Sequence, residues 1–320
     1  MRAAVTGANG FVGSALVRRL ARDGHDVTAC VRALPGAGGD PWRCAVQPVA
    51  VGDIHASTDW ARALDGVSVL VHTAARVHVM HETADDALSA FREVNVAGTV
   101  NLARQAAAAG VHRMVLVSSV KVLGESTAPG RPFTAQDTAA PQDAYARSKQ
   151  EAEDGLRQVA ADTGMAWVVV RPPLVYGPGV RANFGALVGW LRRGMPLPLG
   201  GVTQNRRSLV ALDNLVDFLV LCTQHPQAPG HHFLVSDGED LSTAALLTRL
   251  GQAMHRPARL LPVPPASLAW GAALLGRRAL ALRLLGSLQV DMSATQHITG
   301  WRPPVSVDDG LRQVVRELAP

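Results

Sequence analysis

A glycine-rich turn near the N-terminus is the feature that most constrains how this chain can fold. It reads VTGANGFVG over residues 5–13, between an apolar run of strand type and a segment with helical periodicity. Glycines at every third position allow a tight turn, close approach of the backbone to a phosphate, and close packing of the helix on a sheet. The N–H groups and the dipole at a helix N-terminus attract a pyrophosphate. We therefore predict that a dinucleotide cofactor is bound by Gly7, Asn9, Gly10, Phe11, Val12 and Gly13.

Apolar runs of strand length alternate with helical stretches through the first half of the chain. The runs are continuous, which is typical of strands buried on both faces of a parallel sheet. Repeated strand–helix units of this kind predict an α/β fold, a doubly wound parallel sheet of the Rossmann type. The predicted strands are residues 3–5, 27–31, 67–71, 114–117 and 167–170, and the predicted helices are residues 11–22, 87–109 and 144–161.

Beyond Arg171 the chain changes to loops that are rich in proline and glycine. This change predicts a second, smaller region, with a ligand cleft between the two. We predict a dinucleotide-binding domain of residues 1–175 with 205–236, and a C-terminal substrate domain of residues 176–204 with 237–320.

Composition narrows the kinds of partner. The net charge is +5, but the arginines are scattered as singles and pairs, which argues against nucleic acid and for an anionic small ligand. Three cysteines without metal-ligand spacing predict a reduced, cytoplasmic chain. His72, His78 and His81 also lack ligand spacing, so we expect no metal site.

The most apolar late segment, residues 260–285, is interrupted by three prolines and then by three arginines. Such a segment is too polar to span a bilayer, and we expect no transmembrane segment and no signal peptide. Binding of this segment to a membrane surface is an alternative that the sequence leaves open.

Further short motifs follow the glycine turn in a fixed order. Together they resemble the extended short-chain dehydrogenases/reductases of the NAD(P)-dependent nucleotide-sugar epimerase/dehydratase family, over residues 1 to about 240. The resemblance implies an enzyme acting on a nucleotide-diphosphate sugar in surface-polysaccharide synthesis. It also implies a homodimer joined through the helices around 87–109 and 144–161. The motifs are GDI at 52–54, HTAA at 72–75, NVAGT at 95–99, YARSK at 145–149, RPPLVYGPG at 171–179 and RSLVALDNL at 207–215.

The same resemblance assigns further cofactor contacts. Asp53 and Ile54 correspond to the turn that contacts adenine. Ala74 and Ala75 correspond to the strand end beside the cofactor. Asn95 corresponds to an asparagine that orders the backbone near the site.

Tyr145 and Lys149 lie four residues apart on a predicted helix and therefore share one face. A neighbouring ammonium group and a positive nicotinamide are expected to lower the pKa of the Tyr145 phenol, which is otherwise near about 10. Tyr145 can then exchange a proton with a sugar hydroxyl. Ser119, at the end of a predicted strand, is expected to hold the reacting oxygen. We predict Ser119, Tyr145 and Lys149 as catalytic residues, with Lys149 also bound to the nicotinamide ribose.

Arg32 bears on the choice of cofactor. NAD-dependent relatives usually carry an acid at the end of the second strand, where this chain has Val31 followed by Arg32. Because an arginine can pair with a 2′-phosphate that an acid would repel, we expect NADP(H), with NAD(H) as the alternative.

Candidate substrate contacts are spread over both predicted regions. Asn183 and Arg207 match positions at which relatives hold the nucleotide diphosphate, and Arg283 is a further candidate. His78 and Lys121 are candidates for contact with the sugar. The predicted substrate-binding residues are therefore Lys121, His78, Asn183, Arg207 and Arg283.

The residues after Ser119 restrict the reaction. Dehydratases of this family carry an acid directly after the catalytic serine or threonine, and this chain has Val120, so loss of water has no proton donor. Two reactions at C4 remain, reduction of a 4-keto sugar with NADPH and 4-epimerisation with retained NAD. Arg32 favours the reductase, with the epimerase as the alternative. A non-catalytic NADP-sensing protein is the remaining class, which the presence of both Tyr145 and Lys149 disfavours.

Overall fold

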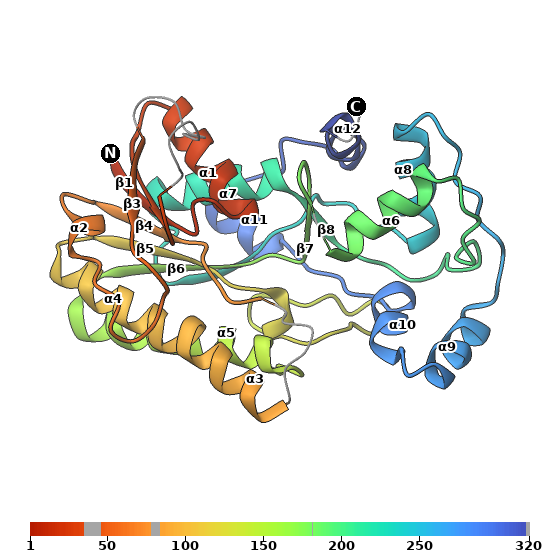
Figure 1. The fold of residues 1–320 in the computed structure, drawn as a ribbon, viewed down its shortest axis with the longest axis horizontal. Coiled ribbons are helices and arrows are strands. Elements are labelled where there is room, and N and C mark those ends of the chain that lie inside the picture. The colour runs from red at the N-terminus through yellow and green to blue at the C-terminus, as the bar shows by residue number, and fades with distance from the viewer. Residues whose placement is uncertain (35–45, 78–83, 181, 318–320) are drawn as a thin grey trace.

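The computed structural model describes residues 1–34, 46–77, 84–180 and 182–317. They contain a seven-stranded parallel sheet with the order β3-β2-β1-β4-β5-β6-β9 (Figure 1). The order reverses next to β1, so β1 and β4 flank the crevice in which open α/β sheets bind ligands. The strands are β1 (Arg2–Thr6), β2 (Asp26–Val31), β3 (Val46–Ala50), β4 (Val69–His72), β5 (Arg113–Val117), β6 (Ala166–Arg171) and β9 (His231–Leu234).

The predicted fold class and all five predicted strands are confirmed. The two edge strands, β3 and β9, were not predicted. β3 reads VQPVA and buries only Val49 fully, and β9 begins with two histidines, so neither forms the continuous apolar run that identified the other strands. Edge strands tolerate such residues because one side of each lacks a strand partner.

The predicted helices are also present, with one internal change. α1 (Phe11–Arg22) and α5 (Ala144–Thr163) cover the expected residues. The long helix expected over 87–109 is divided into α3 (Ala84–Phe91), a π-helical turn (Arg92–Ala97) and α4 (Gly98–Ala108).

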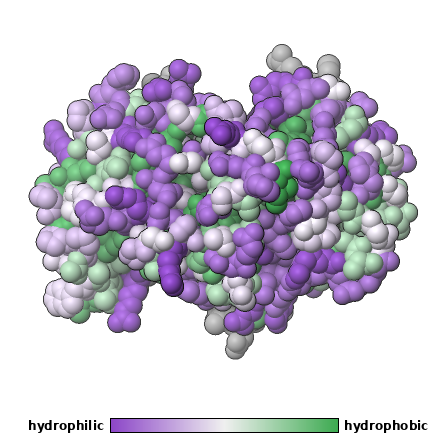
Figure 2. Space-filling model, turned by 180° about the vertical axis from the view of Figure 1, so that it is seen from behind, coloured by the Kyte–Doolittle hydropathy of each residue, from purple (hydrophilic) through white to green (hydrophobic). Residues whose placement is uncertain are grey.

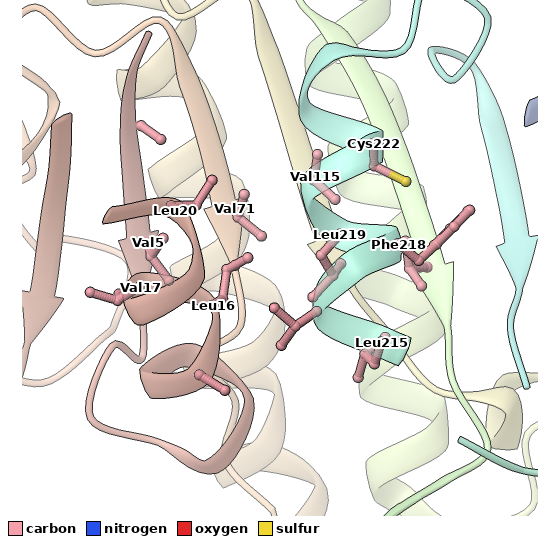
Figure 3. Packing of buried hydrophobic residues seen from close by; sticks show 14 of the residues in the cluster. Val5, Leu16, Val17, Leu20, Val71, Val115, Leu215, Phe218, Leu219 and Cys222 are labelled. Carbon is pink, nitrogen blue, oxygen red and sulfur yellow. The ribbon is translucent and has the colours of Figure 1, made fainter. Parts of the chain in front are cut away.

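Helices cover both faces of the sheet. α1 and α7 (Leu212–Gln224) lie side by side on one face, where Leu16 and Leu20 of α1 and Leu219 of α7 pack on Val5, Val71 and Val115 (Figure 3). α4 and α5 cover the other face, together with the short α2 (Ala61–Leu64). α11 (Ser293–Thr299) contacts β9.

A second group of elements surrounds a two-stranded parallel sheet, β7 (Leu174–Tyr176) with β8 (Leu209–Ala211). Its core is a separate apolar cluster that includes Tyr176, whose hydroxyl donates to Asp237 over 2.7 Å. The proposed domain boundaries stay a prediction. The helices here are α6 (Ala182–Arg192), α8 (Thr243–Ala253), α9 (Pro265–Leu274), α10 (Arg278–Leu285) and α12 (Val307–Glu317).

A buried carboxylate fastens α5 to the carboxyl ends of the central strands. Glu153 of α5 pairs with Arg171 at the end of β6, with Oε2 2.5 Å from Nη2 and Oε1 3.1 Å from Nε. The hydroxyl of Ser118, directly after β5, donates to the same carboxylate. Glu153 and Arg171 are both buried, so their charges depend on one another.

Replacing Glu153 by Gln should therefore destabilise the fold strongly. The substitution leaves the buried Arg171 guanidinium without its counter-charge, and we expect a loss of about 3–5 kcal/mol in the free energy of unfolding. Urea unfolding followed by circular dichroism measures this loss. Asp154→Asn is the matched control, because Asp154 pairs with Arg157 on the exposed side of the same helix and should cost no more than about 0.5 kcal/mol. Equal losses in the two variants would contradict the assignment.

Candidate active site

A cavity of about 1120 Å³ opens at the carboxyl edge of the sheet, next to the ends of the paired strands β1 and β4. It is lined by the glycine turn, by the ends of β2, β4 and β5, and by the start of α5. Among the predicted residues, those that line it are Gly7, Asn9, Gly10, Phe11, Val12, Gly13, Arg32, Asp53, Ile54, Ala74, Ala75, Ser119 and Tyr145. Asn95 and Lys149 are buried and are not among the lining residues.

The turn between β1 and α1 depends on two of its glycines. Gly7 has a φ of +66°, and a Cβ atom there would lie 2.9 Å from the backbone of Ala74. A Cβ atom on Gly13 would lie 2.1 Å from the carbonyl oxygen of Gly7. The turn therefore packs against both β4 and its own helix, and the N–H groups of the first turn of α1 point toward the cavity edge. This cradle fits the pyrophosphate of a dinucleotide.

Arg32 does not stand alone at the end of β2. Its Nε atom lies 2.8 Å from Oδ1 of Asp53, and both side chains are exposed at the cavity. An arginine that already faces a carboxylate presents less positive charge to a 2′-phosphate. The pairing weakens the sequence-based argument for NADP(H).

A buried polar chain orders the ends of β1 and β4. Nδ1 of His72 lies 2.6 Å from the Thr6 hydroxyl, and Nε2 lies 3.1 Å from the Thr99 hydroxyl. Thr99 donates its own proton to the carbonyl of Asn95, so it accepts from Nε2–H of His72, and Thr6 donates to Nδ1. Burial, and secondarily the charge of Lys149, lowers the pKa of His72 to about 3, so the imidazole is neutral.

Asn95 hydrogen-bonds the backbone of the segment after β4. Its Oδ1 accepts from the backbone N–H of Arg76 over 2.8 Å, and its Nδ2 donates to the Arg76 carbonyl and to the Ser148 hydroxyl. Ser148 donates in turn to the carbonyl of Tyr145. Asn95 lies in the π-helical turn, a local irregularity that is common at functional sites. It thus connects the segment after β4 with the first turns of α5.

The three predicted catalytic residues come from two adjacent elements. Ser119 follows β5 in extended conformation, and its Oγ accepts from the backbone N–H of Lys121, which leaves the hydroxyl proton available. Tyr145 lies in the first turn of α5 and packs edge-on against Phe91. Lys149 lies one turn further along α5, fully buried. Ser119 and Tyr145 therefore face one cavity, with Lys149 on the same helix face as Tyr145.

The pKa of Tyr145 shifts in the direction opposite to the expected one. Burial, and then the carboxylate of Asp143, raises it to about 12. Burial lowers the pKa of Lys149 to about 8, although the nearby Glu153 carboxylate acts against this shift. The lowering expected from a neighbouring ammonium and a nicotinamide does not occur in the protein by itself, because burial disfavours the phenolate and the Asp143 carboxylate adds a negative charge nearby. A positive charge placed in the cavity would act in the expected direction.

Lys121 bridges two carboxylates. Its Nζ atom lies 2.5 Å from Oδ2 of Asp143 and 2.5 Å from Oε1 of Glu125. Asp143 caps α5, since its Oδ1 accepts from the backbone N–H of Ala146 over 2.6 Å. Burial raises the pKa of the Asp143 carboxyl, but hydrogen bonds from Lys121 and Ala146 outweigh it, so the pKa is lowered. Lys121 thus holds Asp143, the cap of the helix start that carries Tyr145.

A second cavity of about 280 Å³ adjoins the first and shares Ser119, Pro173 and Val175 with it. Three of the predicted substrate contacts, Lys121, Arg207 and Arg283, line this cavity. Arg207 donates to the carbonyl of Gly286 over 3.1 Å. Burial lowers its pKa, which the Glu125 carboxylate partly offsets. These three predicted contacts thus lie beside Ser119.

Two predicted substrate residues cannot be placed. His78 lies outside the described residues. Asn183 lies near the start of α6, and its side chain is outside the described part of the chain. Within the described ranges no group of three histidines, cysteines or carboxylates is arranged to hold a metal ion.

Several residues of the site were not predicted from the sequence. Glu125 and Thr243 line the second cavity, and Asp143 links Lys121 to Tyr145. Glu125 could have been found, because it lies four residues after Lys121, a spacing that often pairs opposite charges. Thr243 gave no such signal, since its approach to the cavity depends on the packing of α8.

Comparisons with known proteins agree with this geometry. The pattern of the family described as "NAD dependent epimerase/dehydratase family" matches residues 3–236. A UDP-glucose 4-epimerase of Vibrio cholerae is 45% identical over 314 residues, which cover 98% of this chain and 94% of that protein.

Solved structures share the fold. A UDP-N-acetylglucosamine 4-epimerase from Bacillus cereus superposes with a TM-score of 0.81 at 16% identity and covers 100% of both chains. A UDP-glucuronic acid 4-epimerase from Bacillus cereus in complex with NAD has a TM-score of 0.79 at 19% identity, covering 99% of this chain and 98% of that one. At these identities the likeness establishes the fold alone.

The neutral, buried His72 predicts a pH dependence of stability. Below about pH 6.5 the unfolded chain binds a proton at this position that the folded chain does not bind until about pH 3. The free energy of unfolding should therefore fall as the pH falls, and His72 should account for about 2 kcal/mol of the loss between about pH 7 and pH 5. Denaturant unfolding at several pH values should show a shallower slope for His72→Asn than for the wild type. His112→Asn, which changes an exposed histidine, should keep the wild-type slope; a His72→Asn slope equal to wild type would refute the account.

Proposed function

The chain belongs to the NAD-dependent epimerase/dehydratase family, and we propose that it epimerises C4 of a UDP-linked hexose or N-acetylhexosamine. The observation that carries the proposal is the joint position of Ser119 and Tyr145 on one cavity wall, beside the glycine turn and next to a second cavity lined by arginines. The extensive identity with the Vibrio cholerae UDP-glucose 4-epimerase supports the choice of reaction.

The reductase that the Arg32 argument favoured has less support than the epimerase. Its premise was a free arginine at the end of β2, and Arg32 instead pairs with Asp53. The relatives and solved structures compared above carry the names of 4-epimerases. We therefore propose epimerisation, which the sequence had suggested only as the alternative.

The residues of the cavity suit a nicotinamide dinucleotide, held by the glycine turn and by Asp53 and Ile54 at its far end. When bound, a nicotinamide would supply the hydride chemistry that inversion at C4 of the sugar requires. We propose that Tyr145 takes the C4 hydroxyl proton in the first half and gives it back in the second. The Ser119 hydroxyl, whose oxygen is already engaged by the Lys121 N–H, donates to the reacting oxygen.

Lys149 supports this proton exchange electrostatically. It is a buried cation on the same face of α5 as Tyr145, and a cation there opposes the effect of Asp143 on the phenol. Because the proton leaves and returns at one residue, the reaction needs no net acid or base from solvent. This balance suits an enzyme that keeps its cofactor through the cycle.

NAD(H) is the cofactor that we propose. The carboxylate of Asp53 beside Arg32 would oppose the negative charge of a 2′-phosphate, and the Bacillus cereus UDP-glucuronic acid 4-epimerase with the same fold was solved with NAD. The homodimer through α4 and α5, and the division into two domains, also remain proposals.

The direct test of the reaction is to incubate the protein with UDP-glucose, and separately with UDP-N-acetylglucosamine, without any added reductant. We expect the C4 epimers to interconvert, which chromatography of the sugar nucleotides measures. The absorbance of the nicotinamide band should show no net change. Tyr145→Phe should lower turnover by about 100-fold or more while leaving cofactor binding intact.

Tyr176→Phe is the matched control, because the chain has only these two tyrosines. Tyr176 is buried and bonded to Asp237, so this variant should lose stability rather than turnover. Net consumption of NADPH with a 4-keto sugar, and no epimerisation, would replace the epimerase by the reductase.

Cofactor preference can be tested through Asp53. We expect the wild type to bind NAD(H) more tightly than NADP(H) in a fluorescence titration. Asp53→Asn should move the affinity ratio toward NADP(H) by about tenfold, because it frees Arg32 and removes a repelling charge. Asp65→Asn, an exposed acid away from the cavity, should leave the ratio unchanged. Tighter binding of NADP(H) by the wild type would restore the original expectation.

A further inference from the structure

α9 is an apolar helix that buries none of its residues. It reads PASLAWGAAL and contains no charged side chain. An ordinary surface helix has a polar face toward water, and an all-apolar helix is normally buried. α9 has no charged face and is not buried, so its apolar outer surface is exposed.

The exposed apolar side chains gather at the C-terminal end of this helix. Trp270 is 70% exposed, Leu274 is 68% exposed, and Leu275, directly after the helix, is 75% exposed. Trp270 and Leu274 are four residues apart and share one helix face. The corner of the molecule that α9 occupies in Figure 1 is mainly green and white in Figure 2, where it is seen from behind.

The charge around this surface has one sign. From residue 241 to residue 290 the chain carries six arginines and no aspartate or glutamate. Arg277 and Arg278 follow the exposed leucines in the turn to α10, and both are exposed. No carboxylate of the described residues forms an ion pair with either of them, whereas Arg249 in the same stretch pairs with Glu239.

We propose that this surface, formed by Trp270, Leu274, Leu275, Arg277 and Arg278, docks on an anionic phospholipid bilayer. A tryptophan is favoured at the level of the lipid headgroups, and leucines beside it can enter the upper acyl region. The two arginines at the end of the helix can then pair with lipid phosphates. An apolar tip bordered by unpaired cations has the chemistry that an anionic membrane surface recognises.

The geometry describes a helix that lies on the membrane. None of the helices in the described ranges combines the length and the apolarity that a membrane-spanning segment needs. Ten residues of helix extend about 15 Å, about half the thickness of the hydrocarbon core. α9 packs against α10, and Leu280, Arg283 and Leu284 of α10 line the second cavity. Docking through α9 would therefore hold the substrate side of the protein next to the bilayer.

A second copy of this chain fits the surface less well. A two-fold contact through α9 would bring Arg277 and Arg278 of both copies together, and like charges across an interface are repulsive. The surface thus favours a partner with the opposite charge.

The test is co-sedimentation of the full chain with vesicles at about 0.1 M salt, where exposed charges are still felt over about 10 Å. One set of vesicles contains phosphatidylcholine alone, and the other contains phosphatidylcholine with phosphatidylglycerol. We expect binding to the anionic vesicles, at least about fivefold weaker binding to the neutral ones, and release at higher salt. The double variant W270S/L274S should lose most of this binding.

Two variants that remove the same charge at different places distinguish binding through this surface from a general effect of net charge. R277Q/R278Q should weaken binding to anionic vesicles severalfold, whereas R18Q/R22Q removes two exposed arginines from α1 and should leave it unchanged. All variants change exposed side chains, so thermal unfolding should stay at wild-type values. The proposal is overturned if the wild type binds neither vesicle, or if both arginine pairs have equal effects. It is also overturned if W270S/L274S changes only the mass in solution, which would make the surface a contact between copies.

Discussion

The buried carboxylate of Glu153 is the interaction on which the geometry of the site depends. It receives hydrogen bonds from Ser118 after β5 and from Arg171 at the end of β6, while it belongs to α5. Ser119 follows Ser118 directly, and Lys149 lies one turn before Glu153. The hydrogen bond from Ser118 therefore ties the segment that carries Ser119 to the helix that carries Tyr145 and Lys149, and the ion pair ties β6 to the same point of that helix. The cost of burying the Glu153 carboxylate is offset only while Ser118 and Arg171 both stay in place.

The same carboxylate makes a buried lysine tolerable. Lys149 has no access to water, and burial alone would favour its neutral form. Glu153, one turn away, acts in the opposite direction. At the N-terminus of α5, the carboxylate of Asp143 raises the pKa of Tyr145, and Lys121 partly neutralises the charge of Asp143. The phenol thus lies between opposing charges, an arrangement in which a modest added charge in the cavity can change its proton affinity.

Local sequence constraints predicted the parts of the site that one segment builds by itself. The glycine turn was predictable because the close approach of Gly13 to Gly7 is possible only without side chains. The shared face of Tyr145 and Lys149 was predictable because helix periodicity fixes it. The links made by Glu153 and Asp143 were not, because their partners lie 35 and 22 residues away in the chain. The sequence likewise gave no sign that Arg32 would face Asp53, since the two meet only after β2 and β3 pair.

The segment after Ser119 explains why the chemistry should stay at C4. Val120 is buried in a small apolar cluster with Leu123 and Leu288, so the position where dehydratases carry a proton donor belongs to the core in this chain. Lys121, the next residue, forms ion pairs with Glu125 and Asp143. Val120 has no group that can protonate a departing hydroxyl or remove a proton from a neighbouring carbon. In the proposed reaction Tyr145 exchanges the proton, and a site with one such group suits a reaction in which the same proton leaves and returns.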